Sequence, residues 1–151
     1  MADDSSEIVR DMVRGGARAT RIIADDLLGA AVENAPIDEG TLRASGHVVY
    51  VVNDVEFHGG QYAEAVAMAV ELAATGALTA FYAEVRFSTE YAAAQHEGIA
   101  LMHRAGHSWL WQARNYPKGG GPKYLERPFD ERASRYEAAL AASIRPQLAG
   151  D

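Results

Sequence analysis

A long amphipathic pattern near the N-terminus constrains the fold more than any other feature of the sequence. Residues 5–34 predict one helix, because apolar residues recur at three- and four-residue steps and most charged residues lie elsewhere on the helical wheel. We expect the helix to end at Asn34-Ala35-Pro36, since the residue before a proline is driven out of helical conformations. Gly15-Gly16 lowers helix stability by about 1 kcal/mol per glycine relative to alanine, so it marks a weak point or a close packing contact.

The rest of the chain alternates strand and helix patterns. The clearest strand signal is at 80–88, where aromatic and aliphatic residues alternate with polar ones. No internal repeat or linker divides the 151 residues, so we expect a single domain over 1–151. Before 80–88 we expect a capped turn at 36–45, one strand at 47–57 and a short helix at 61–74. After it we expect a hairpin of 99–102 and 108–112 around Gly106 and a flexible loop at about 103–123. A last helix should run from about Tyr124 or Pro128 to Ile144, where Arg145-Pro146 stops it.

Composition excludes several classes of function. The chain has no cysteine, which rules out a disulfide framework, a thiol nucleophile and a cysteine zinc site. Its formal net charge of −7 argues against a protein that binds nucleic acid by neutralising phosphates. No apolar run is long enough to cross a membrane, and the acidic N-terminus is unlike a signal peptide. We therefore expect a protein that is cytoplasmic where it is made and has no membrane partner.

The residues that carry catalysis in other proteins do not form a catalytic motif here. His96-Glu97 resembles the start of a zinc-protease helix, but that motif needs a second histidine where this chain has Ala100. His103 and His107 share a ligand face only if 103–107 is helical, which Gly106 disfavours. No Gly-x-Ser-x-Gly elbow and no phosphate-binding glycine loop is present. We expect no enzyme, no cofactor and no metal; a metal-dependent hydrolase using these three histidines and Glu97 is the alternative.

Two further groups have both a structural and a functional interpretation. Trp109 and Trp111 are two residues apart, so in a strand both point to one side, either into the subunit's own core or onto a contact surface. A basic cluster in the acidic chain is either a solvated loop or a contact with DNA or an acidic neighbour. Its members are Arg104, Arg114, Lys118 and Lys123.

Three stretches, taken in order, carry a resemblance to a known family. They are Ala35-Pro36-Ile37-Asp38-Glu39-Gly40-Thr41-Leu42-Arg43-Ala44-Ser45, Tyr91-Ala92-Ala93-Ala94-Gln95-His96-Glu97-Gly98 and Lys123-Tyr124-Leu125-Glu126-Arg127-Pro128. Their order and spacing resemble the small neck, tail-completion or minor capsid proteins of long-tailed bacteriophages. The alanine-rich helix at 61–74 departs from the shorter members of that family.

The resemblance implies a fold and a role. It implies an α+β subunit, with a small antiparallel sheet packed by long N- and C-terminal helices and one additional short helix between strands. It also implies a ring, commonly six-fold, at the head–tail junction of the virion, in the neck or at the tail end as a tail terminator. Such a ring contacts neighbouring neck and tail proteins and lets DNA pass without specific binding. A capsid-associated decoration protein is an alternative.

Under this interpretation, the residues of the matched stretches are architectural and the loop that follows them is the contact surface. The acidic net charge suits a channel past which DNA slides. The expected architectural residues are Asp38, Gly40, Arg43, His96, Glu97, Gly98, Tyr124, Leu125 and Pro128, and the candidate interface residues are Arg104, Trp109, Trp111, Arg114, Lys118 and Lys123.

A deletion in the basic loop tests the contact surface. We expect that removing 114–122 leaves the fold intact, because the segment is glycine-rich and carries little apolar surface, but blocks the joining of heads to tails. Particle yield after complementation measures the effect. A normal yield of particles from the deletion variant would show that the loop is not part of the contact surface.

Overall fold

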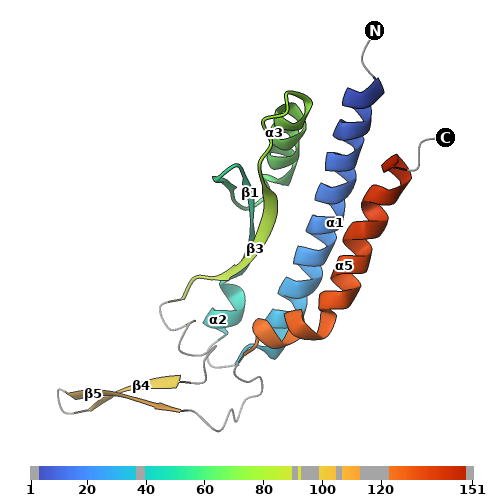
Figure 1. Ribbon diagram of the computed structural model, residues 1–151. Helices are drawn as coiled ribbons and strands as arrows, with labels where there is room; N and C mark the ends of the chain where they lie inside the picture. The colour runs from blue at the N-terminus through green and yellow to red at the C-terminus, as the bar shows by residue number, and fades with distance from the viewer. Residues whose placement is uncertain are drawn as a thin grey trace. The chain divides into compact units, whose positions relative to one another are not determined.

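The chain folds as an α+β protein, which confirms the predicted fold class (Figure 1). The computed structural model describes residues 4–36, 40–89, 92, 99–104, 107–112 and 123–148. The elements are α1 (Asp4–Asn34), α2 (Thr41–Ala44), β1 (Gly46–Val52), β2 (Val55–Phe57), α3 (Tyr62–Ala74), β3 (Phe81–Phe87), β4 (Ile99–Arg104), β5 (His107–Gln112) and α5 (Glu126–Leu148). They build a three-stranded antiparallel sheet of order β2-β1-β3 and a two-stranded sheet of β4 and β5.

The described residues divide into two compact units. The first takes residues from 1–26, 48–85 and 132–151, and the second takes residues from 27–47 and 86–131. Helices α1 and α5 and strands β1 and β3 contribute residues to both units. Each unit therefore combines segments that are far apart in the sequence.

Helix α1 begins and ends within one residue of the range that the hydrophobic pattern predicts. Its inner face is built of small residues, because Ala17, Ala24 and Ala31 are all buried and recur at seven-residue intervals. Alanine has the highest helix propensity and lets neighbouring backbones approach closely. The Gly15-Gly16 pair does not interrupt the helix.

The single strand predicted at 47–57 is wrong, because this stretch forms a hairpin. Strands β1 and β2 pair antiparallel, with Val52 opposite Val55 across a two-residue turn. Asn53 and Asp54 both adopt positive φ, 45° and 68°. Positive φ at both central residues is the requirement of a type I′ turn, and asparagine and aspartate tolerate it better than most residues. Valines lie directly on both sides of the turn and no glycine marks it, so the sequence pattern did not reveal it.

The Asn53 side chain ties this turn to the segment before β3. Its Oδ1 accepts hydrogen bonds from the Thr79 amide at 2.8 Å, the Thr79 hydroxyl at 2.9 Å and the Ala80 amide at 3.2 Å. Its Nδ2 donates to the Ala77 carbonyl at 2.8 Å. One side chain thus satisfies backbone groups that would otherwise lack partners beside the sheet.

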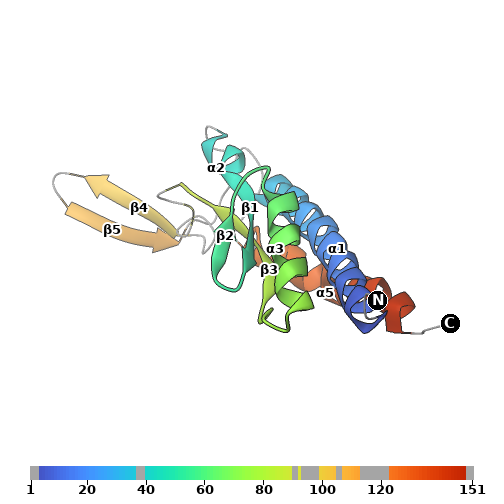
Figure 2. The same cartoon turned by 90° about the horizontal axis from the view of Figure 1, so that it is seen from above.

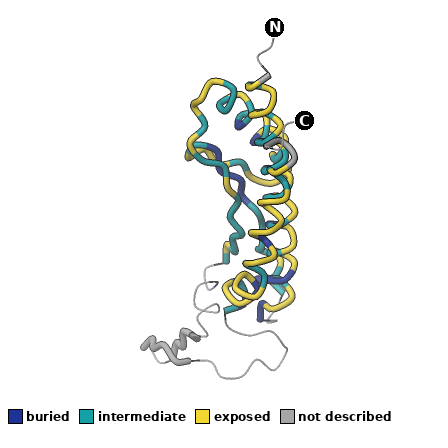
Figure 3. The backbone as a smooth tube through the Cα atoms, turned by 45° about the vertical axis from the view of Figure 1, so that its right-hand side comes forward, coloured by how far each residue is buried: buried dark blue, intermediate teal, exposed yellow. Residues whose placement is uncertain are grey.

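The core of the first unit lies between the three-stranded sheet and helix α3. Strand β1 is buried over four consecutive residues, Val49 to Val52 (Figure 3). Helix α3 lies alongside the β1–β2 hairpin in both views (Figures 1 and 2). Its Ala65 and Ala69 are buried in one cluster with Tyr50 and Val52. Consecutive burial in β1 means that both faces of the central strand are covered.

Helix α5 extends further than the sequence indicates. We predicted that Arg145-Pro146 stops it at Ile144, but the helix runs from Glu126 to Leu148. A proline removes one backbone hydrogen bond from a helix interior. At Pro146 only two helical residues follow, so this loss is confined to the last turn. At the other end, Pro128 is the third residue, within the first turn where proline is tolerated.

One carboxylate joins α1 to α5 in the first unit. Asp26 Oδ2 accepts a 2.7 Å hydrogen bond from the Tyr136 hydroxyl and a 2.8 Å bond from Arg135, with Arg132 Nε at 3.3 Å. The hydrogen bond from Tyr136 and the two arginines lower the pKa of Asp26. Burial and the bond to Asp26 raise the pKa of Tyr136 to about 12, so its hydroxyl remains a donor at neutral pH.

We expect this carboxylate to make folding stability depend on acid pH. A group whose pKa is lowered by folding stabilises the fold above its unfolded pKa, about 3.9 for aspartate, and loses that contribution as the pH falls through the folded pKa. Asp26→Asn should therefore lower the free energy of unfolding at pH 7 and flatten its decline below about pH 4. Urea titrations between about pH 2 and pH 7 measure the free energy of unfolding of both chains. If this free energy depends on pH in the same way for the wild type and for Asp26→Asn, the role of Asp26 is contradicted.

Candidate assembly site

The second unit is organised around a small apolar cluster drawn from three separate segments. Ala35, Leu42, Ala92 and Tyr124 are each at least 93% buried, with exposures of 0%, 2%, 7% and 3%. Phe87 and Leu125 pack against them. Ala35 and Leu42 belong to the first stretch that carries the resemblance, Ala92 to the second, and Tyr124 with Leu125 to the third. The fold therefore brings all three stretches into one contact.

Tyr124 is the largest member of this cluster. Its ring meets the edge of Phe87 at a centroid distance of 5.0 Å and an interplanar angle of 79°, a favourable edge-to-face geometry. Its hydroxyl donates a 3.0 Å hydrogen bond to the Ala92 carbonyl. Burial raises the pKa of the Tyr124 phenol, which keeps it protonated as the donor. The Tyr124 side chain thus contributes an apolar contact to the cluster and a hydrogen bond to the second of the three stretches.

The turn after α1 is fixed by Gly40 and Arg43. Gly40 has φ 80°, a left-handed conformation that glycine adopts more readily than any other residue. Arg43 folds back onto the end of α1: its guanidinium donates to the Ala35 carbonyl at 2.8 and 3.0 Å and to the Glu33 carbonyl at 2.9 Å. Carbonyls at a helix C-terminus lack helical donors and carry partial negative charge, so a cation stabilises them.

Two residues of this site were missed by the sequence reasoning. A Cβ on Gly46 would lie 2.9 Å from both Leu28 Cδ1 and Phe87 Cε1, so any larger residue here would have to displace these side chains. The Ser45 hydroxyl accepts a 3.2 Å hydrogen bond from the Ser88 amide just beyond β3. Ser45 ends the first matched stretch and Gly46 follows it, but the role of each depends on contacts made across the fold.

The other predicted architectural residues divide into two groups. Pro128 is fully buried at the start of α5, and Leu125 packs on the cluster. Asp38, His96, Glu97 and Gly98 lie outside the described residues.

Two candidate interface residues also lie outside the described chain, Arg114 and Lys118. Lys123 has φ 57° and forms a 2.9 Å ion pair with Glu126, so part of its charge is used within the chain. Arg104, Trp109 and Trp111 are on the β4–β5 hairpin.

The predicted hairpin around Gly106 is confirmed and is longer than expected. Strand β4 continues to Arg104, so part of the range that we expected as a flexible loop is paired strand. Trp109 lies opposite Met102, Trp111 opposite Ala100, and Arg104 opposite His107. Within the described chain, β4 and β5 pair only with each other.

The described residues offer no metal centre. They contain no group of three or more histidine and acidic side chains that would hold an ion. His103 and His107 are on paired strands, His103 opposite Ser108, so they do not have the helical spacing that a shared ligand face requires. No helix in the described part is long and apolar enough to cross a membrane.

No protein-family model, curated protein or solved structure matches the chain.

We expect substitutions at Tyr124 to separate its two contributions. Tyr124→Phe removes the bond to the Ala92 carbonyl and should lower the free energy of unfolding by about 1 kcal/mol. Tyr124→Ala also removes the buried ring and should lower it by about 3–5 kcal/mol. Urea denaturation measures both. Tyr82→Phe, at a residue that is 42% exposed, is the matched control and should change stability by less than about 0.5 kcal/mol. If Tyr124→Phe changes the free energy of unfolding as little as this control does, the role of the hydroxyl is contradicted.

Proposed function

We propose that this chain is a structural subunit of a long-tailed bacteriophage, a head–tail connector component of the neck or tail end that forms a ring around the DNA exit channel. It acts by binding copies of itself and neighbouring neck and tail proteins. It carries out no chemical reaction. In this proposal its place is the head–tail junction of the virion, reached from the host cytoplasm during assembly.

The convergence of the three matched stretches is the observation that carries this proposal. Short motifs that match by chance have no reason to meet in space. Here Leu42, Ala92 and Tyr124, one from each stretch, share a single buried cluster. This supports the view that the stretches specify one architectural unit, as the resemblance implies.

The β4–β5 hairpin supplies a second argument. A two-stranded sheet alone is marginally stable in water, and three or more strands or a packing partner are usually needed. Among the described residues these two strands pair only with each other, so their outer edges present unpaired backbone groups. Strand addition from a neighbouring subunit satisfies such edges. A hairpin of this kind suits a protein that is completed by assembly.

The charge of the chain fits passage of DNA. A formal net charge of −7 repels phosphates, so DNA that moves through the ring is not held by counterion release. A basic neck surface would bind DNA and slow its exit. The acidic balance supports a channel without specific DNA contacts.

Loss of the chain tests the proposal during infection. We expect that inactivating its gene leaves DNA-filled heads and separate, complete tails, because only their joining fails. Electron microscopy of the lysate distinguishes this result from empty heads or missing tails. Normal infectious particles made without the chain would contradict the proposal.

The hairpin is tested by a matched pair of variants in the same complementation assay. Met102 lies opposite Trp109 in the β4–β5 ladder, two positions from the closing pair Arg104–His107, so Met102 and Trp109 exchange backbone hydrogen bonds. Met102→Pro breaks the ladder, because proline lacks the amide donor, whereas Met102→Val keeps it. We expect the proline variant to keep its helical circular dichroism but fail to join heads to tails, and the valine variant to support joining.

A further inference from the structure

The arginines of α1 differ in how their charge is neutralised. They are Arg10, Arg14, Arg18 and Arg21, at three- and four-residue intervals along the helix. Arg10 and Arg14 form ion pairs of 2.9 to 3.3 Å with acidic residues of the same helix. Arg21 Nε lies 3.9 Å from Asp25, which is beyond hydrogen-bonding distance. Arg18 forms no hydrogen bond or ion pair with the residues that the structure describes. Two guanidiniums thus keep their N–H donors available.

The Arg21 guanidinium is held over an aromatic ring in the first unit. Its Cζ lies 4.7 Å from the centroid of the Tyr62 ring, a cation–π contact. Tyr62 packs edge-on against Tyr50, at a centroid distance of 5.2 Å, and Tyr50 is only 4% exposed. The ring under Arg21 is therefore anchored in the core. Because this contact restricts the guanidinium before any ligand arrives, binding an anion there costs less side-chain entropy.

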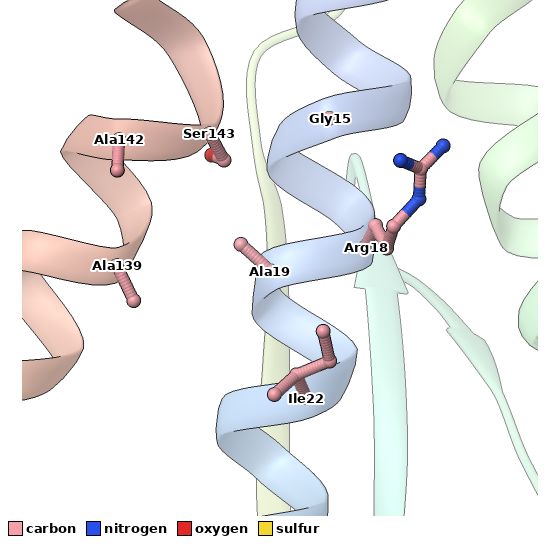
Figure 4. Close-up of a pocket in the computed structure, with 7 residues that line it drawn as sticks. All are labelled: Gly15, Arg18, Ala19, Ile22, Ala139, Ala142 and Ser143. Atoms are coloured by element: carbon pink, nitrogen blue, oxygen red, sulfur yellow. The ribbon is translucent and has the colours of Figure 1, made fainter.

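Arg18 is directed to the same side of α1. Figure 4, a close-up of the pocket between α1 and α5, shows the Arg18 side chain pointing away from α5, toward α3, the helix that begins at Tyr62. Burial raises the pKa of Tyr62, and the positive charges of Arg21 and Arg18 oppose this rise. The phenol is therefore protonated at neutral pH, and both charges act on it. Its hydroxyl makes no hydrogen bond within the described part of the chain.

The chemistry of this group selects its ligand. Two guanidiniums and a phenol proton are all donors, so the complementary ligand supplies acceptors and negative charge. A carboxylate presents two oxygens in one plane, which a single guanidinium satisfies. A phosphate group presents its oxygens in a tetrahedron, so it can meet donors that come from two different helices. Phosphate therefore fits the group better than a carboxylate does.

We propose that Arg18, Arg21 and the Tyr62 hydroxyl form a phosphate-binding site on the side of α1 that faces α3. The phosphate comes either from solution or from the backbone of DNA, and the chemistry of recognition is the same for both. The net charge of −7 disfavours phosphates over the chain as a whole, so the site is one local contact and does not grip DNA as a basic groove would. This inference goes beyond the proposed function and does not depend on it.

An NMR titration of the full chain with sodium phosphate, at constant ionic strength and neutral pH, tests the site. We expect saturable shifts of the Arg18, Arg21 and Tyr62 amides, and weaker binding of acetate. Arg18→Gln and Arg21→Gln should each weaken phosphate binding by about tenfold or more, because each removes a charge-assisted hydrogen bond. Tyr62→Phe keeps the ring under Arg21 and should weaken it by about threefold to tenfold.

Arg14→Gln is the matched control, because it makes the same charge change on the same helix at an arginine that is already paired. It should leave phosphate binding unchanged. Circular dichroism checks that each variant is folded. Competition by a short DNA duplex then identifies the source: displacement of phosphate assigns the site to DNA, and no displacement assigns it to free phosphate. Either result keeps the site.

Three results would overturn the proposal. The first is a titration in which the three amides do not shift. The second is binding by the Arg18 and Arg21 variants that equals binding by Arg14→Gln. The third is acetate binding as tight as phosphate binding, which would make the group a contact for a carboxylate of another protein. Normal particles made without the chain would contradict the proposed function but would leave phosphate binding unaffected.

Discussion

Burial of the Tyr124 side chain is the interaction on which the second unit depends. The segments that meet there bring little apolar surface of their own: Ala35 and Ala92 are small, and Leu42 is in a helix of four residues. A large common neighbour lets all three segments bury their apolar surface in one contact. The Tyr124 ring is buried in one cluster with residues of these segments and contacts Phe87, and its hydroxyl donates a hydrogen bond to the Ala92 carbonyl. Arg43 fixes the first segment independently, through the terminal carbonyls of α1.

The sequence predicts what local periodicity and turn chemistry determine. Helices α1 and α3, strand β3 and the β4–β5 hairpin follow from residue patterns, and the left-handed conformation of Gly40 follows from its place in a turn. The β1–β2 hairpin was missed because apolar residues lie directly on both sides of Asn53-Asp54 and no glycine marks the turn. The end of α5 was misplaced because a proline in the last turn of a helix removes only one backbone hydrogen bond there and need not end the helix.

The candidate site was only partly predictable, for a physical reason. The matched stretches mark the residues, but their meeting depends on long-range packing that no local pattern contains. The close packing at Gly46, for example, arises only because Leu28 and Phe87 lie against it. Among the described residues β4 and β5 pair only with each other, and an unpaired strand edge is a template for pairing with another chain.

The number of copies in a purified virion tests the central claim, that this chain is a ring subunit at the head–tail junction, most directly. Quantitative mass spectrometry against the major capsid protein gives this number. A closed ring, or two stacked rings, predicts about six or twelve copies per particle. Hundreds of copies would indicate a decoration protein spread over the capsid, and a virion without the chain would contradict a structural role in it.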